Sequence, residues 1–297
     1  MKPAPFHYHR PTTVGEALEL LADHPEAEVM AGNQSLGIVM GNRLATPDHV
    51  VDINRISDLG FVDVDDDEVA VGAMARHRDV ERSDALRSSV PMLPEAAEQI
   101  AGPSVRSRGT VGGSLCEADP AGNYPTAAVA LDADLHLVSA EGERTVAARD
   151  FFLGFMMTDL GEAELVERLT VDRGPFPPER TGMAFLELKP AAQTWPTISA
   201  AAAVRVDDPT GEAPVIEEAR LALANAADVP LHVPGAGSAV AGEPLSEAGL
   251  DAVAEAAADA ANPSDELHAD AEFKREVAAE YARRAVETAY GRATGER

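Results

Sequence analysis

Cysteine is nearly absent from this sequence, with Cys116 the only one in 297 residues. One cysteine forms no internal disulfide, and it is too few for an iron–sulfur cluster or a cysteine-ligated zinc ion. The eight histidines are dispersed along the chain, and we interpret the pair His7 and His9 as a coincidence on the surface rather than as two ligands. We therefore expect no metal site.

Basic residues are also few. The chain has 24 lysines and arginines against 51 aspartates and glutamates, which gives a formal net charge of −27. Binding to nucleic acid needs a concentrated basic surface, so the composition argues against a nucleic-acid partner. The acidic residues are spread along the whole chain, which indicates a solvated surface. This composition resembles that of proteins from salt-loving organisms, where salt screens the self-repulsion.

Long apolar runs are missing as well. No stretch of about 18 uninterrupted apolar residues occurs, and the first ten residues lack the apolar run of a signal peptide. We expect a cytoplasmic protein without membrane insertion. The length of 297 residues and the hydrophobic fraction of 45% suit a globular chain with a sizeable core and either two domains or two lobes.

The spacing of the apolar residues predicts both helices and strands. Helices are expected over 13–24 and 91–101, and a hairpin is expected to turn at Glu141 and Gly142. The segment 171–180 is rich in proline and charge, which is typical of an exposed boundary. Beyond it we expect a three-stranded sheet with helices. The expected ranges are 183–190, 197–207 and 215–227 for the strands, and 245–261 and 264–293 for the helices.

Two segments with glycines and short polar side chains interrupt this pattern. They read VMAGNQSLGIVMGNRLA over 29–45 and GTVGGSLCEADPAGNYPT over 109–126. Glycine permits positive φ and close approach of the backbone to another object, and consecutive backbone N–H groups in a turn suit an anion such as a pyrophosphate. Neither segment fits a Walker loop or the Rossmann fingerprint. Each alone reads equally well as a tight turn, but two together favour a bound ligand.

The order and spacing of these segments and their neighbours resemble one family, the FAD-binding medium subunits of the molybdenum hydroxylases. That group includes carbon monoxide dehydrogenase, xanthine dehydrogenase and aldehyde oxidoreductases. The likeness spans nearly the whole chain, and it is carried by FHYHRPTTVGEALELL, AGNQSL, HVVDINRI, AVGAM, VRSRGTVGGSLCEADPAGNYPTAAVALDA, RDFFLGF and FLELKP.

The resemblance implies an α+β fold. A two-lobed FAD-binding domain of the vanillyl-alcohol-oxidase-like type would occupy residues 1–172, with lobes of about 1–56 and 57–172. A smaller α/β C-terminal domain would occupy residues 180–297.

The resemblance also implies which residues bind FAD. The first segment would wrap the pyrophosphate, and the second would supply further contacts. Leu160 and Lys189 match positions close to the isoalloxazine, where a cation stabilises the reduced anionic flavin. Asn123 falls where an aspartate near the ribityl or adenosine end is usual. The segment residues concerned are Ala31, Gly32, Asn33, Gln34, Ser35 and Leu36, and Thr110, Val111, Gly112, Gly113 and Ser114.

Several residues depart from the family pattern or need an interpretation. Asn33 replaces a second glycine, and asparagine tolerates left-handed φ better than most residues. Asn123 keeps the hydrogen-bonding capacity of the usual aspartate and loses its charge. Glu117 stands where a neutral polar residue or histidine is more usual, and we interpret it as a surface carboxylate. We expect Cys116 to be a small buried filler, and Trp195 to pack in the core in preference to stacking on the flavin.

The implied function is electron transfer. FAD would collect electrons from the 2Fe-2S clusters of a small subunit, which drains a molybdopterin-binding large subunit, and would pass them to an external electron acceptor. No catalytic side chain is expected in this chain, because the flavin carries the chemistry. Two alternatives stay open: a self-contained flavin oxidoreductase, and a redox-inactive nucleotide-binding scaffold subunit.

Overall fold

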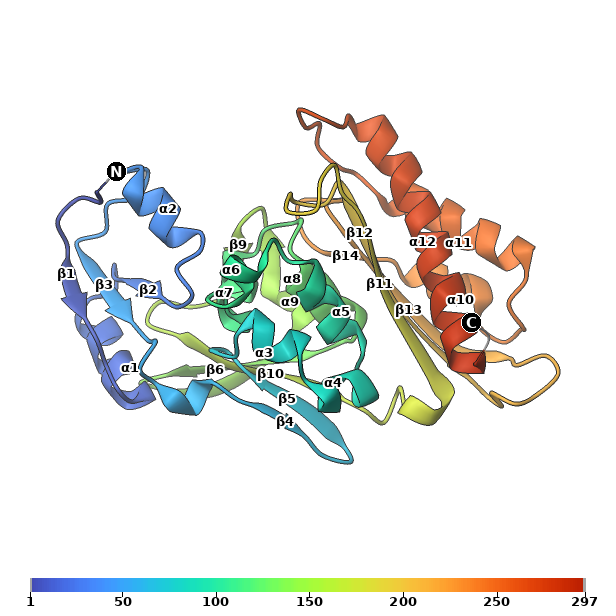
Figure 1. Ribbon diagram of the computed structural model, residues 1–297, viewed down its shortest axis with the longest axis horizontal. Helices are drawn as coiled ribbons and strands as arrows, with labels where there is room; N and C mark the ends of the chain where they lie inside the picture. Colours follow the sequence, from blue (N-terminus) through green and yellow to red (C-terminus); the bar gives the residue numbers. More distant parts are fainter. Residues whose placement is uncertain (1, 296–297) are drawn as a thin grey trace.

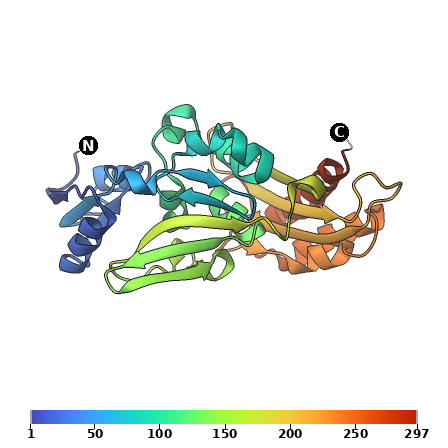
Figure 2. The same cartoon turned by 90° about the horizontal axis from the view of Figure 1, so that it is seen from below.

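The chain is elongated, with its two termini at opposite ends (Figures 1 and 2). The computed structural model describes residues 2–295, and they form an N-terminal lobe, a central lobe and a C-terminal part in sequence order. No helix within these residues is long and apolar enough to cross a bilayer.

The N-terminal lobe is a small parallel sheet with the strand order β1-β3-β2 and two helices. Helix α1 begins where the Thr13 side chain accepts a hydrogen bond from the Glu16 backbone N–H, and it packs Leu18 and Leu21 into the core of the lobe. The expected helix over 13–24 is thus confirmed. The elements are β1 (His7–His9), α1 (Val14–Asp23), β2 (Glu28–Met30), α2 (Leu36–Gly41) and β3 (His49–Asp52).

The central lobe is an antiparallel sheet with the strand order β4-β5-β10-β6-β7, covered by short helices. The expected hairpin between β6 and β7 turns at Gly142, whose φ of 145° suits glycine. The strands are β4 (Val62–Val64), β5 (Glu68–Gly72), β6 (Asp134–Ser139), β7 (Gly142–Ala147), β8 (Phe152–Gly154), β9 (Met157–Thr158) and β10 (Leu165–Asp172). The helices are η1 (Ser57–Leu59), α3 (His77–Glu81), α4 (Asp84–Ser89), α5 (Met92–Gln99), α6 (Pro103–Arg106), α7 (Val111–Glu117), α8 (Asn123–Ala130) and α9 (Ala148–Phe151).

The C-terminal part is an antiparallel sheet with the strand order β11-β12-β13-β14, and helices α10 to α12 cover one face of it (Figure 1). The sheet has four strands where three were expected, because the two-residue strand β14 is too short to show a period in the sequence. The elements are η2 (Pro178–Arg180), β11 (Thr181–Leu188), β12 (Ile198–Val206), β13 (Ile216–Ala224), β14 (Leu231–His232), α10 (Pro234–Val240), α11 (Glu247–Ala260) and α12 (Ala271–Thr294).

Helix α12 begins later than the expected 264. The Asp270 side chain accepts a hydrogen bond from the Phe273 backbone N–H at 2.8 Å and caps the helix, so the residues before it lie outside. The apolar stripe alone did not reveal this cap.

Both faces of the C-terminal sheet are buried. Residues 200–203 of β12 are four consecutive alanines, all fully buried, and they alternate between two hydrophobic clusters. Ala201 and Ala203 belong to the core of the central lobe, which includes α5 and α8, while Ala200 and Ala202 face α12. Small side chains allow this close approach: a Cβ atom on Gly182 of β11 would lie 1.9 Å from the Ala289 carbonyl oxygen of α12. The C-terminal sheet and the central lobe therefore share one core.

Candidate nucleotide-binding site

The two glycine segments meet where the N-terminal lobe joins the central lobe. A Cβ atom on Gly32 would lie 2.5 Å from the Arg108 carbonyl oxygen and 2.6 Å from Gly109 Cα. Any side chain at position 32 would therefore separate the two backbones. The sequence prediction that the two segments form a single site is consistent with this contact.

The second segment is the first turn of helix α7 rather than an open turn. Thr110 is its N-cap, and its hydroxyl accepts a hydrogen bond from the Gly113 N–H at 3.1 Å. Val111 and Gly112 donate to the carbonyls of Ala75 and Ala73, and Ser114 donates to that of Thr110. The expected array of unpaired donors is therefore wrong for residues 111–114, whose N–H groups already have partners inside the protein.

The glycines of the second segment serve close packing and not unusual backbone angles. Gly109, Gly112, Gly113 and Gly122 are absent from the positions with positive φ. A Cβ atom on Gly112 would lie 2.6 Å from the Ala73 side chain, and one on Gly109 would lie 2.4 Å from the His77 imidazole. Helix α7 can thus lie directly against the end of strand β5.

The first segment has the array of donors that the second lacks. Within residues 2–295, the backbone N–H groups of residues 32–37 make no hydrogen bond. Asn33 adopts the left-handed conformation with a φ of 57°, as expected of its replacement of glycine, and its buried Oδ1 atom has no partner. A row of consecutive free amides at the start of helix α2 suits an anion, and the partly exposed residues 33–37 leave it accessible.

A polar network holds the amino end of the first segment, at Ala31. The Asn54 side chain donates to the Ala31 carbonyl at 2.7 Å, and the Arg76 guanidinium donates to Asn54 Oδ1 at 2.7 Å. Arg76 also donates to the Arg108 carbonyl at 2.5 Å, which joins the network to the second segment. The sequence analysis did not single out Asn54 or Arg76, because both lie outside the glycine segments. Asn54 belongs to HVVDINRI, which served only for the family resemblance, and Arg76 belongs to none of the quoted segments.

Arg76 and Gly109 also flank a buried histidine. His77 packs against Gly109 and the Tyr124 ring, and its Nδ1 atom has no hydrogen-bond partner within the described chain. Burial, with the neighbouring charges of Arg76 and Arg106, lowers the pKa of His77 to about 4. His77 is therefore neutral at neutral pH and supports the second segment as a packing residue.

Glu117 joins the two segments from the carboxyl end of α7. Its carboxyl group lies beside the Ser35 side chain, and burial raises its pKa by more than the neighbouring Ser35 hydroxyl lowers it. The interpretation of Glu117 as a surface carboxylate is therefore wrong. Its neighbour Cys116, expected to be buried, is exposed to solvent.

Lys189 lies beside the end of helix α5 and the loop that leads to helix α6. It lines a pocket of about 610 Å³ together with residues that include Gln99, Gly102 and Arg106. Its ammonium group lies 2.6 Å from the Glu187 carboxylate and donates to the Gln99 carbonyl. Several lining residues lie between positions 98 and 106, shortly before Gly109 in the chain.

The remaining residues singled out in the sequence have other surroundings. Asn123 is almost fully buried and donates to the Ala96 carbonyl at 2.9 Å, so its amide already has a protein partner. It also lies close enough to Glu187 to lower the pKa of that carboxyl group, although burial raises it. Leu160 is partly buried against the core of the central lobe. Trp195 is 56% exposed, so the expected core packing is wrong.

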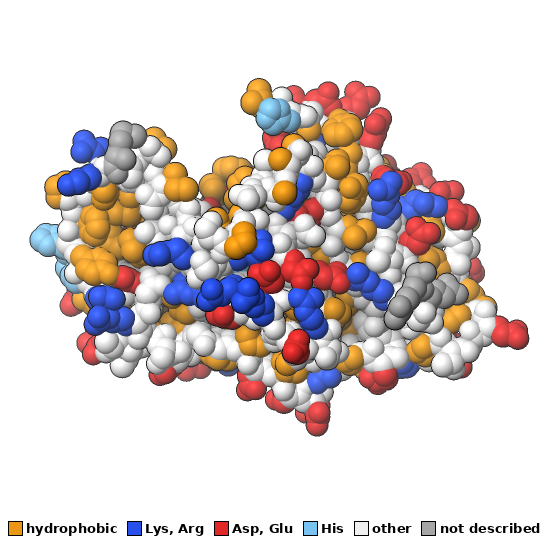
Figure 3. Space-filling model, viewed as in Figure 1, with side chains coloured by type: hydrophobic (Ala, Val, Ile, Leu, Met, Phe, Trp, Pro, Cys, Tyr) orange, Lys and Arg blue, Asp and Glu red, His pale blue; other side chains and the backbone are white. Residues whose placement is uncertain are grey.

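The surroundings of the free amides suit a phosphate-bearing ligand. Figure 3 shows a hollow between the N-terminal lobe and the rest of the molecule, with Lys and Arg side chains gathered across the middle of this face, although the whole chain is strongly acidic. A Cβ atom on Gly113 would meet the Thr110 hydroxyl and otherwise only Ala31, at 3.9 Å, which leaves the surface of α7 open beside the first segment. Free amides, open backbone and nearby arginines are features that suit a ligand with a pyrophosphate.

Comparison with known proteins identifies the family. Residues 4–172 match the FAD binding domain in molybdopterin dehydrogenase, and residues 183–289 match the CO dehydrogenase flavoprotein C-terminal domain. The chain is 35% identical over 293 residues to the carbon monoxide dehydrogenase medium chain of Hydrogenophaga pseudoflava, covering 98% of this chain and 99% of that one. It is 35% identical over 234 residues to the caffeine dehydrogenase subunit beta of Pseudomonas sp. strain CBB1, covering 78% and 77%.

A solved structure agrees with these matches. The chain superimposes on a carbon monoxide dehydrogenase structure from Hydrogenophaga pseudoflava with a TM-score of 0.92 and 35% identity, covering 98% of this chain and 99% of that chain. The chain therefore belongs to the family of FAD-binding medium subunits of the molybdenum hydroxylases, oxidoreductases built from several subunits. The α+β fold, the cofactor FAD and the oxidoreductase class implied by the sequence are confirmed.

The contact at Gly32 gives a first prediction. Gly32→Ala places a methyl group against the Arg108 carbonyl, and overpacking of this kind costs about 1–3 kcal/mol. We expect FAD affinity to fall by about tenfold or more, since 1.4 kcal/mol is a factor of ten. Gly15→Ala in helix α1 is the control, because a Cβ atom there has no neighbour within 4 Å. Equal FAD affinities of the two variants in fluorescence titrations would contradict the assignment.

Glu117 gives a prediction about pH. Because burial raises its folded-state pKa, the unfolded chain releases this proton first, and the stability of the protein decreases as pH rises through the two values. Glu117→Gln removes this loss and keeps the shape of the side chain. In thermal melts we expect the difference, Tm of the variant minus Tm of the wild type, to be more positive at pH 8 than at pH 4. A Tm difference that does not change with pH would contradict the raised pKa of Glu117.

Proposed function

We propose that this chain accepts electrons from the 2Fe-2S clusters of a small subunit and passes them from FAD to an external electron acceptor. The large subunit of the complex would hold molybdopterin and the substrate site. The observation that carries the proposal is the row of free amides over residues 32–37 at the junction of two lobes. The match of both segments of the chain to medium-subunit domains supports it.

We place the pyrophosphate of FAD on the first segment and the isoalloxazine toward the pocket at Lys189. Ala31, Gly32, Asn33, Gln34, Ser35 and Leu36 would bind the pyrophosphate, while Thr110 and Ser114 offer their side chains. Val111, Gly112 and Gly113 would form the wall beside it. Asn123 would act through Glu187, and Leu160 would contact the ring.

The FAD supplies the redox chemistry, and the side chains of this chain hold and orient it. The ammonium group of Lys189 would face the flavin, but its charge is balanced by the Glu187 carboxylate at 2.6 Å. Its effect on the reduced anionic flavin is therefore weaker than that of an unpaired cation. Burial raises the pKa of Glu187, so at low pH the carboxyl group takes up a proton and leaves the lysine charge unbalanced.

Asn33 and Glu117, which depart from the family pattern, do not favour a redox-inactive scaffold subunit. Asn33 adopts the left-handed conformation that a glycine would have there, so the turn of the first segment is kept. Burial raises the pKa of Glu117, so its carboxyl group takes up a proton more readily, which reduces its repulsion of a phosphate. Both features support binding of a dinucleotide.

The face that carries the arginines is a good candidate for the partner interface. Arg78, Arg82 and Arg108 are exposed there, beside the half-buried Arg76 and Arg106. On a chain with a net charge of −27, this basic region over α3 and α6 attracts an acidic partner surface while the rest of the chain repels it (Figure 3). This basic region includes Arg106, which also lines the pocket at Lys189. A small subunit bound there would therefore lie close to the proposed position of the flavin.

We also propose the division of the chain into a FAD-binding domain over 1–172, with lobes 1–56 and 57–172, and a C-terminal domain over 180–297. The substrate of the complex would be set by the large subunit. In support, the two relatives described above are named for carbon monoxide and for caffeine, yet each is 35% identical to this chain.

The purified chain tests the proposed role. Without partners it should bind FAD and show visible flavin absorption, reduce dyes weakly with NADH, and fail to oxidise aldehydes, purines or carbon monoxide. Steady turnover of any of these substrates would support the self-contained oxidoreductase instead. A colourless protein that takes up no FAD would support the scaffold subunit.

The acidic composition gives a prediction about salt, and with it we propose a halophilic source. The self-repulsion of a chain at −27 weakens as the screening length falls from about 30 Å at 0.01 M to about 3 Å at 1 M ionic strength. We expect Tm and FAD retention to rise across a KCl series over this range. A Tm that does not change with KCl concentration would overturn the halophilic reading.

A further inference from the structure

Four histidines gather on one face of the sheet in the N-terminal lobe. His7 and His9 alternate along β1 and so share a face, and the parallel register pairs His7 with His49 of β3. His24 is the C-cap residue of helix α1, and its ring stacks on that of His49 with a centroid distance of 3.7 Å. The sequence analysis noted His7 and His9 but interpreted them as a surface coincidence, because His24 and His49 are distant in the chain and only the fold brings them near.

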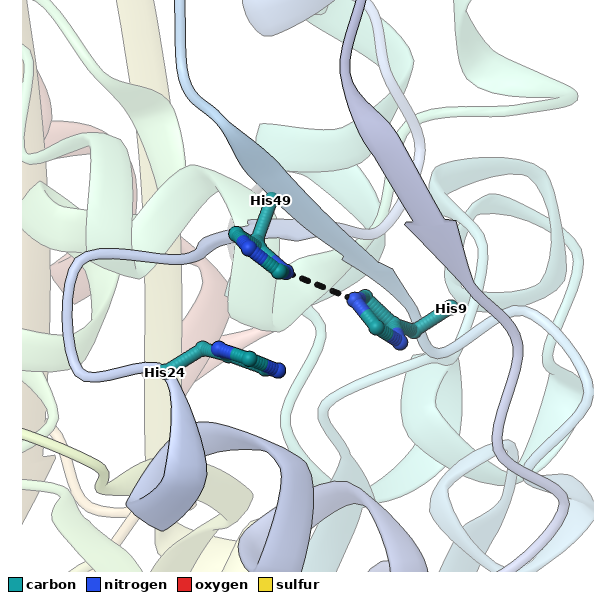
Figure 4. A group of neighbouring side chains, drawn as sticks. All are labelled: His9, His24 and His49. Carbon is teal, nitrogen blue, oxygen red and sulfur yellow. Dashed lines mark hydrogen bonds between the residues drawn. The ribbon is translucent and has the colours of Figure 1, made fainter.

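Three of these rings have the geometry of potential metal ligands. One ring nitrogen from each of His9, His24 and His49 lies within 4.8 Å of the other two (Figure 4). His9 Nε2 and His49 Nδ1 are 2.8 Å apart and share a hydrogen bond. Tetrahedral zinc with ligands at about 2.0–2.1 Å separates its ligand nitrogens by roughly 3.3 Å. The upper limit of 4.8 Å exceeds this spacing, so metal binding would require the rings, including the stacked pair His24 and His49, to turn about their side-chain bonds.

The surroundings of the three rings suit a shared cation. All three side chains are half-buried, and each ring lies against at least one of the others. A divalent cation would be attracted to three imidazole lone pairs at once, and the negative charge of the whole chain raises its local concentration.

We propose that His9, His24 and His49 form a binding site for a divalent transition metal that prefers imidazole, with zinc as the probe and water as the fourth ligand. This site replaces the earlier expectation of no metal in the chain. The three ligands come from β1, α1 and β3, so the bound metal ties together the lobe that presents the free amides of residues 32–37. In Figure 3 histidine side chains lie at the outer edge of this lobe, away from the hollow.

The experiment uses the untagged full-length protein, freed of metal with a chelator and then titrated with zinc alone in a calorimeter. We expect one zinc ion per chain and a rise in Tm on binding, because a ligand of the folded state stabilises it. His24→Ala should lower zinc affinity by at least about tenfold, since the loss of even an outer-shell partner has an effect of that size. His268→Ala is the matched control, because His268 is exposed and lies in the loop before α12.

The readouts separate metal binding from folding. Far-UV circular dichroism and FAD absorption should be unchanged in His24→Ala, and His9→Ala gives a second variant should the first fail to fold. The proposal is overturned if the wild type binds no stoichiometric zinc at micromolar concentration. It is also overturned if a folded His24→Ala or His9→Ala variant binds zinc as tightly as His268→Ala.

Discussion

The contact of backbone with backbone between Gly32 and the Arg108–Gly109 peptide is the constraint on which the rest of the site depends. It holds the N-terminal lobe against the central lobe at the point where the free amides of residues 32–37 begin. The Arg76 side chain reinforces this contact, because its guanidinium donates hydrogen bonds to both Asn54 and the Arg108 carbonyl. The missing side chain of Gly32 and the long side chain of Arg76 therefore stabilise the same junction.

Local pattern was enough to predict many of the elements. Helix α1, the β6–β7 hairpin and the long strands β11 to β13 have clear periodicity or turn residues, so they follow from the sequence. Strand β14 and the start of α12 do not, because a two-residue strand has no period and a cap depends on one side chain. The identity of the family came from the order of short segments, which is information about ancestry rather than about local physics.

The candidate site was predictable in position but not in the role of each segment. Both glycine segments were placed in one site, yet within the described residues only the first has a row of six consecutive unpaired amides, at 32–37. The N–H groups of residues 111–114 are occupied by Ala73, Ala75 and Thr110, and only the first two of these partners come from a different segment of the chain. Asn54, Arg76 and the histidine cluster were missed for the same reason: their meaning arises from neighbours that the fold supplies.

The N-terminal lobe has the smallest of the three hydrophobic clusters, and part of that cluster belongs to the central lobe, including Leu59, Met74 and Val138. The C-terminal sheet, by contrast, is merged with the central lobe into one core. The contact between the N-terminal lobe and the central lobe at Gly32 is therefore expected to open at a lower free energy than the shared core, and its amides should exchange with solvent first. Release of FAD would then proceed by a brief undocking of the first 56 residues. The rate of FAD loss would measure the stability of this contact and not that of the whole protein.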